Sequence, residues 1–88
     1  MKVEGVDFKN RDRFVELGIT ISALRKLRGM SQEQLAEKVG ISRGFLSVIE
    51  APNMIQSFSL EILFNIADAL GVRAGDLLNN SIFTEEWK

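Results

Sequence analysis

The stretch from residue 32 to residue 51 reads QEQLAEKVGISRGFLSVIEA and decides the fold of this 88-residue chain. It predicts two short helices joined by a tight turn. Gly40 stands where the first helix should stop, because glycine enters the left-handed conformation of a helix C-cap without steric cost. Ala36 lies on the inner face of the first helix, where a small side chain lets the second helix cross closely.

The second of these helices has two faces of different character. Aliphatic residues at helical spacing on the two helices should point into a shared core, and these are Leu35, Val39, Leu46 and Ile49. The positions left facing outward on the second helix are Arg43, Gly44, Ser47 and Val48. Serines mark both helix starts, because Ser31 can form a capping box with Gln34 and Ser42 can cap the second helix.

The composition limits the chemistry that the chain can perform. Its residues are 45% hydrophobic, which suits one small domain, and they include no cysteine and no histidine. The commonest metal ligands, the commonest general base and the cysteine nucleophile are therefore missing. We expect no enzymatic activity, no bound metal and no cofactor.

The sequence also predicts a cytoplasmic protein without a membrane segment. No apolar run approaches the roughly 20 residues that are needed to span a bilayer. The first ten residues, MKVEGVDFKN, lack the apolar core of a signal peptide.

Charge is distributed unevenly along the chain, although the net charge is only −1. Residues 1–50 carry nine Lys or Arg against seven Asp or Glu, which gives +2, and residues 51–88 carry two against five, which gives −3. The two-helix stretch thus belongs to the mildly basic half of the chain.

A longer helix should precede the two-helix stretch. We expect residues 1–11 to form an arm, either disordered or folded onto the body, and a helix to run from Asp12 as N-cap to about Arg28, with Gly29 as its stop. Gly18 should loosen the first half of this helix. The basic residues Lys26 and Arg28 at its end should complement the helix dipole.

Two further helices should follow. Pro52 and Asn53 suit the middle of a tight turn. A helix then runs from Ser59 as N-cap to Leu70, with an apolar face made of Leu60, Leu63, Ile66, Ala67 and Leu70. A short helix near residues 74–78 is more weakly signalled. The tail, residues 80–88, contains large apolar residues, namely Ile82, Phe83 and Trp87.

The segment from Phe14 to Leu78 resembles the phage-repressor, Cro-type (XRE) helix-turn-helix family of transcriptional regulators. The resemblance is carried by LRKLRGMSQEQLAEKVGIS, then FLSVIE, then LEILFNIADALGV and DLL, in that order. It implies an all-α fold, a compact lambda-repressor-like bundle of five helices over residues 12–79. In that family the helix at about residues 42–50 of this chain would enter the major groove of DNA.

The resemblance also implies roles for individual residues. Gln32 and Ser42 would contact DNA phosphates, and the outward positions Arg43, Gly44, Ser47 and Val48 would read bases. Arg43 is the expected base reader, because its planar fork can pair with guanine. Arg25 and Glu50 match positions that often form an ion pair in this family.

One departure from the family pattern concerns the segment after the recognition helix. Relatives often carry basic residues there, whereas Ala51 to Ile55 contains no positive charge. Fewer phosphate contacts should weaken DNA binding and flatten its salt dependence. Two copies of the chain would then be needed to read two half-sites about one helical turn apart.

We therefore expect a sequence-specific transcriptional regulator, a repressor, that binds a short pseudopalindromic operator in double-stranded DNA as a homodimer at the nucleoid. Ile82, Phe83 and Trp87 would either contact a second copy or cover the chain's own core. The alternative is a protein-interaction module of antitoxin type on the same scaffold, with weak DNA binding and a protein partner.

Overall fold

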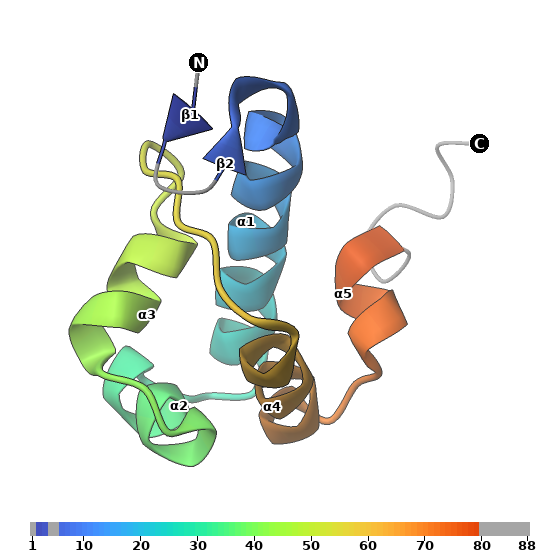
Figure 1. Cartoon of the computed structure of the whole chain (residues 1–88). Coiled ribbons are helices and arrows are strands. Elements are labelled where there is room, and N and C mark those ends of the chain that lie inside the picture. The colour runs from blue at the N-terminus through green and yellow to red at the C-terminus, as the bar shows by residue number, and fades with distance from the viewer. Residues whose placement is uncertain (1, 4–5, 80–88) are drawn as a thin grey trace.

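The computed structural model describes residues 2–3 and 6–79, and within them five α-helices form the body of the protein (Figure 1). The helices are α1 (Arg11–Leu27), α2 (Gln32–Val39), α3 (Arg43–Glu50), α4 (Leu60–Leu70) and α5 (Ala74–Asn79). The predicted all-α bundle is confirmed. The tail residues Ile82, Phe83 and Trp87 lie outside the described residues.

The predicted caps fix the ends of α2 and α3. Ser31 and Gln34 form a reciprocal capping box, in which the Ser31 hydroxyl accepts from the Gln34 backbone N–H at 3.0 Å and the Gln34 amide oxygen accepts from the Ser31 N–H at 2.9 Å. Gly40 ends α2 with φ = 88°, a left-handed conformation that favours glycine. Ser42 accepts from the Phe45 N–H at 3.0 Å and begins α3.

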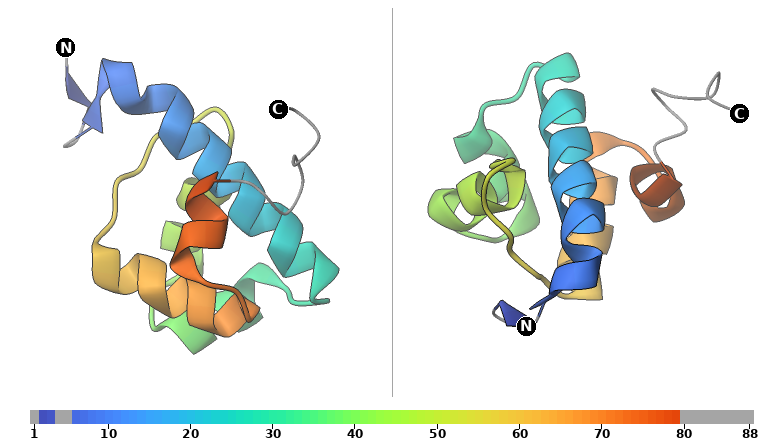
Figure 2. Two further views of the ribbon diagram at one scale, coloured as in Figure 1. Left: turned by 90° about the vertical axis from the view of Figure 1, so that its right-hand side faces the viewer. Right: turned by 90° about the horizontal axis from the view of Figure 1, so that it is seen from above.

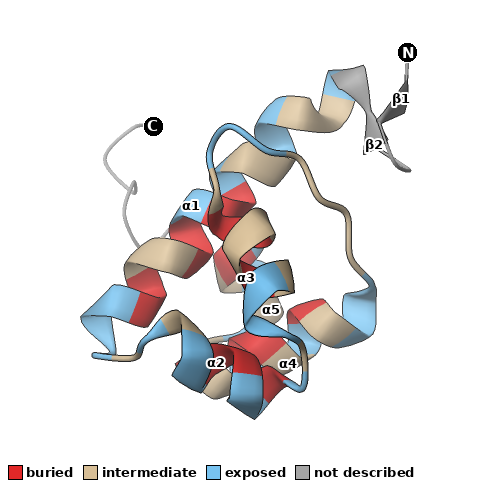
Figure 3. Cartoon of the chain, turned by 90° about the vertical axis from the view of Figure 1, so that its left-hand side faces the viewer, coloured by how far each residue is buried: buried red, intermediate tan, exposed pale blue. Residues whose placement is uncertain are grey.

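The core lies between α1 and the other helices, and Figure 3 shows its buried residues in red along the inner faces. Side chains with the lowest exposure come from every helix, and they are Ile21, Leu35, Leu46, Ile66, Leu70 and Leu77. Ala36 is also buried, as a small residue at a helix crossing should be. All the aliphatic residues that we expected to join α2 to α3 are therefore in place.

Gly18 marks the closest approach of α1 to α3. A Cβ atom at this position would overlap the backbone carbonyl oxygen of Ile49 and would lie 3.5 Å from the Cα atom of Glu50. We expected Gly18 only to loosen α1, whereas the structure gives it a packing role. Because Gly18 has no side chain, the backbones of α1 and α3 can touch.

The start of α4 partly differs from the prediction. Ser59 caps the helix, accepting from the Ile62 N–H at 3.2 Å, and Gly71 ends it with φ = 76°. Leu60, however, is 67% exposed and does not belong to the buried face. It lies one turn before Phe64, which is 51% exposed, so the two form an apolar pair on the outer surface of α4.

The N-terminal arm contains more structure than its sequence indicated. Strand β1 (Lys2–Val3) pairs antiparallel with β2 (Val6–Asp7), and the 3₁₀ turn η1 (Phe8–Asn10) follows. Because η1 leads directly into α1, the helix begins at Arg11 with Asn10 at the N-cap position, and the predicted cap Asp12 is wrong. Asp12 lies instead in the first turn, where an acidic side chain suits the helix dipole.

Helix α5 contacts both α1 and α4, which Figure 2 shows from two directions. Leu77 provides its buried anchor. A hydrogen bond also connects the end of α1 to the end of α4, because the Arg28 Nε donates to the carbonyl oxygen of Leu70 at 2.8 Å. Arg28 thus serves the C-terminal end of α4 and not only the dipole of its own helix. None of the helices in the described part of the chain is long and apolar enough to cross a membrane.

Candidate nucleic-acid interface

Helices α2 and α3 lie side by side on one side of the molecule, with α1 behind them (Figure 3). The inner face of α3 is fully used by the core, since Leu46 and Ile49 are buried. The outer face presents the four predicted positions. Arg43 and Gly44 are exposed, and Ser47 and Val48 are half-buried.

The first turn of α3 combines an exposed cation with an exposed hydroxyl. Arg43 makes no hydrogen bond or ion pair with the residues that the structure describes, so its guanidinium is available to an external acceptor. The Ser42 hydroxyl oxygen is engaged as the helix cap, but its O–H can still donate. A neutral donor and a planar cation at one helix start suit a phosphate oxygen and a guanine edge respectively.

Gly44 leaves a bare patch on the surface of α3. A Cβ atom at this position would have no other atom within 4 Å, so packing inside the domain does not require glycine here. The backbone conformation does not require it either, because Gly44 is absent from the glycines with positive φ. The missing side chain therefore lowers the outer surface of α3 without serving the fold.

Arg25 and Glu50 form the ion pair that the family resemblance implied. The Arg25 Nε donates to Glu50 Oε2 at 2.8 Å, and its Nη2 donates to Oε1 at 2.9 Å. The two side chains are only 9% and 4% exposed, so the pair is shielded from solvent. The Arg25 Nη1 also donates to the Met30 carbonyl oxygen at 2.8 Å. This pair fastens the end of α3 to the end of α1.

Gln32, the first residue of α2, joins the same cluster. Its Nε2 donates to Glu50 Oε1 at 3.0 Å, and its side chain is half-buried. Sequence reasoning missed this bond because residues 18 positions apart meet only once α2 and α3 have packed. The amide nitrogen keeps a second hydrogen, so the predicted phosphate contact stays a prediction that the geometry permits.

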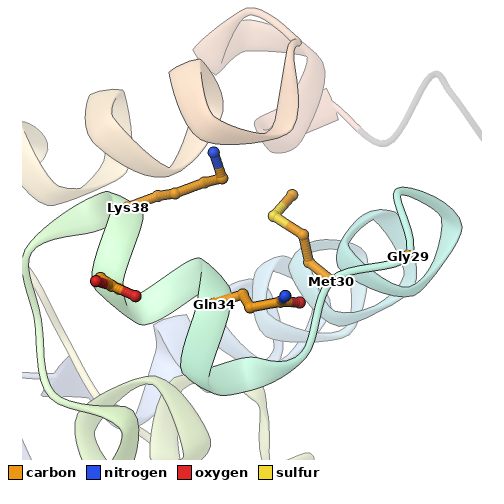
Figure 4. Close-up of a pocket in the computed structure, with 5 residues that line it drawn as sticks. Gly29, Met30, Gln34 and Lys38 are labelled. Carbon is orange, nitrogen blue, oxygen red and sulfur yellow. The ribbon is translucent and has the colours of Figure 1, made fainter.

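A shallow groove lies between α2 and the segment that joins it to α1 (Figure 4). It is lined by Gly29, Met30, Gln34, Glu37 and Lys38. Lys38 and Met30 extend toward the same open space in Figure 4. Within the described ranges, no three His, Cys, Asp or Glu side chains are grouped as a metal site would require.

Known proteins with similar sequences are regulators. The immunity repressor protein of Bacillus phage phi105 is 36% identical over 70 residues, which cover 80% of this chain and 47% of the repressor. The transcriptional regulator SinR of Bacillus licheniformis is 36% identical over 69 residues, which cover 78% of this chain and 61% of SinR. The chain thus spans about half of the first relative's length and three fifths of the second's.

A solved structure similar to this fold contains DNA. It is the crystal structure of SinR, described as the master regulator for biofilm formation, in complex with DNA. Its TM-score is 0.66 at 35% identity, with 72% of this chain and 98% of that chain covered. Residues 21–77 also match the family model described as helix-turn-helix, which covers more than half of the chain. By its sequence and its fold, this chain belongs to the helix-turn-helix family of the phage-repressor, Cro type.

Proposed function

We propose that this chain is a transcriptional regulator that binds double-stranded DNA sequence-specifically and acts as a repressor. The observation that carries the proposal is the division of α3, whose inner face is consumed by the core while its outer face presents a cation without a partner in the described chain. The major groove of B-form DNA is wide enough to admit an exposed α-helix. The similarity to an immunity repressor and to SinR bound to DNA supports the same function.

Each residue of the outer surface has a role in this proposal. Arg43 pairs with a guanine, and Gly44 lets the backbone of α3 approach the base edges. Ser47 and Val48 complete the base-reading surface, with Val48 against a thymine methyl group. The starts of α2 and α3 face the sugar-phosphate backbone, where Gln32 and Ser42 donate to phosphate oxygens.

The proposed active form is a homodimer on a short pseudopalindromic operator in the cytoplasm. One copy offers a single strong base reader and no positive charge from Ala51 to Ile55. Two copies double both the base contacts and the phosphate contacts, and they read half-sites about one helical turn apart. Ile82, Phe83 and Trp87 are the proposed dimer contact.

The test is a selection of binding sequences from random duplexes with the wild-type chain and with Arg43→Ala. The variant should lose its preference at one base pair in each half-site, with discrimination falling by about 1 to 3 kcal/mol there. Arg73→Ala is the matched control, because it removes the same charge from an exposed side chain before α5. Equal base preferences in wild type and Arg43→Ala would remove Arg43 from the proposal.

A second candidate is a protein-interaction module on the same scaffold. The exposed pair Leu60 and Phe64 on α4, together with Leu78 on α5, favours this alternative because apolar surface often marks a partner site. Affinity for mixed duplex DNA at about 50 and about 200 mM salt separates the candidates. A chain that binds DNA loses affinity between these conditions, although less steeply than relatives with basic residues after the recognition helix, whereas a chain that binds no duplex at either concentration supports the protein-interaction module.

A further inference from the structure

The carboxylate of Glu50 accepts more hydrogen bonds than its ion pair requires. Two of them come from Arg25 and suffice to neutralise the buried charge. The third comes from the Gln32 amide nitrogen, at 3.0 Å from Oε1. Gln32 is only half-buried, and it opens the helix whose start faces the DNA backbone in the proposed function. The third bond therefore connects a buried charge to the binding surface.

A primary amide can present either a donor or an acceptor to the same neighbour. Its NH₂ group and its oxygen are similar in shape, and a half-turn of the amide exchanges them. Phosphate oxygens only accept hydrogen bonds, so a freely turning amide would offer them the wrong atom in about half of its orientations. The Glu50 carboxylate removes this ambiguity, because it too only accepts and so selects the nitrogen.

We propose that Glu50 is a positioning residue for DNA binding, which holds the Gln32 amide with its nitrogen beside the backbone of the duplex. One hydrogen of Nε2 binds Glu50 and the second donates to a phosphate oxygen. This inference rests on the proposed function, since it concerns how the same surface grips DNA. The Gln32 side chain is then already ordered in the free protein. DNA binding therefore does not cost the conformational entropy of this side chain.

Arg25 makes the arrangement compatible with DNA. An uncompensated carboxylate close to a phosphate would repel it, but the guanidinium bound to both Glu50 oxygens cancels that charge. Arg25 also donates to the Met30 carbonyl, two residues before Gln32, so the cation is itself fixed beside the start of α2. The three side chains thus form one neutral, hydrogen-bonded unit.

Gln34 provides a matched comparison within the same helix. It also carries an amide near the start of α2, but its oxygen accepts from the Ser31 N–H and its nitrogen has no partner among the described hydrogen bonds. The Gln32 amide is therefore held through its nitrogen, and the Gln34 amide is held through its oxygen. Replacing Gln34 disturbs the cap of α2 but leaves the Glu50–Gln32 bond in place.

The test is a double-mutant cycle on affinity for a duplex recovered by the selection described above. Gln32→Ala should weaken binding by about tenfold per half-site in the wild-type background, the equivalent of one hydrogen bond to a charged group. In the Glu50→Gln background the same change should cost about threefold or less, because the amide is no longer oriented. Gln34→Ala should show no such coupling to Glu50→Gln.

Salt dependence separates positioning from a general loss of the interface. Gln32 is uncharged, so Gln32→Ala should leave the slope of log affinity against log salt unchanged. An equal cost of Gln32→Ala in both backgrounds would overturn the positioning role while leaving DNA binding intact. A wild-type chain that binds no duplex would instead overturn the proposed function and this inference together.

Glu50→Gln can fail to fold, because it leaves Arg25 buried without a counter-charge. Nitrogen relaxation of the side-chain amides in the free wild-type protein then decides the question without any substitution. The Gln32 amide should be as ordered as the backbone of α2, and the Gln34 amide should be more mobile. A Gln32 amide that is clearly more mobile than the backbone of α2 would contradict the proposal.

Discussion

Replacing Gly18 by alanine tests the contact that sets α3 against α1. In an ordinary helix interior this change stabilises the protein by about 1 kcal/mol, because alanine has the higher helix propensity. Here the added methyl group would overlap the Ile49 carbonyl oxygen, which belongs to the backbone of a packed helix and cannot rotate away. Gly18→Ala should therefore destabilise the fold despite the better helix former.

The size of the effect follows from two opposing contributions. Overpacking a well-filled interior costs about 1 to 3 kcal/mol, and a backbone atom as the obstacle favours the upper part of that range. Subtracting the gain of about 1 kcal/mol in propensity leaves a net loss of about 1 to 2 kcal/mol. For a domain of this size each kcal/mol shifts Tm by about 4 to 8 °C, so Tm should fall by roughly 5 to 15 °C.

Thermal unfolding followed by circular dichroism measures this effect, and Gly44→Ala is the matched control. Gly44 also lies within a helix, but a Cβ there meets no atom within 4 Å. That variant should have an unchanged or higher Tm. Its free energy of unfolding should rise by no more than about 1 kcal/mol. If Gly18→Ala raised Tm as Gly44→Ala does, the backbone contact between α1 and α3 would not limit the packing of the domain.

Three further predictions concern the ion pair, the cap of α2 and the tail. Arg25→Met should destabilise the fold by about 3 to 5 kcal/mol in urea unfolding, because it leaves Glu50 buried and unpaired, and adding Glu50→Leu should restore much of that loss. A double variant that is no more stable than Arg25→Met would contradict this explanation. Ser31→Ala should cost about 1 kcal/mol by the same assay, and an unchanged midpoint would show that the capping box adds nothing. Deleting residues 80–88 should convert the proposed dimer to a monomer in sedimentation equilibrium, and an unchanged dimer mass would place the contact elsewhere.

The features that could be predicted from the sequence depend on residues close together in the chain. Ser31 and Gln34 are three residues apart, so their capping box can be recognised without knowledge of the rest of the fold. Gly40 and Gly71 end their helices for a local reason, the left-handed conformation that glycine tolerates. The buried faces of α2 and α3 were predictable because helical periodicity places the aliphatic residues together.

The features that were missed depend on how the helices meet. Nothing near Gly18 in the sequence indicates that Ile49 will lie against it. The same holds for Gln32 and Glu50, and for the bond from Arg28 to the end of α4. Periodicity also failed at Leu60, because it assigns a residue to a helix face without showing how far the neighbouring helices extend along it.

The backbone contact at Gly18 limits how this protein could be regulated. Side chains between two helices can change rotamer and let one helix tilt, but Gly18 has no side chain that could move away from the backbone of Ile49. The buried Arg25–Glu50 pair fastens the same end of α3 to α1. The C-terminal end of α3 is therefore held against α1 by two contacts. In the proposed dimer, we therefore expect a signal that releases DNA to change the distance or angle between the two domains rather than the position of α3 against α1.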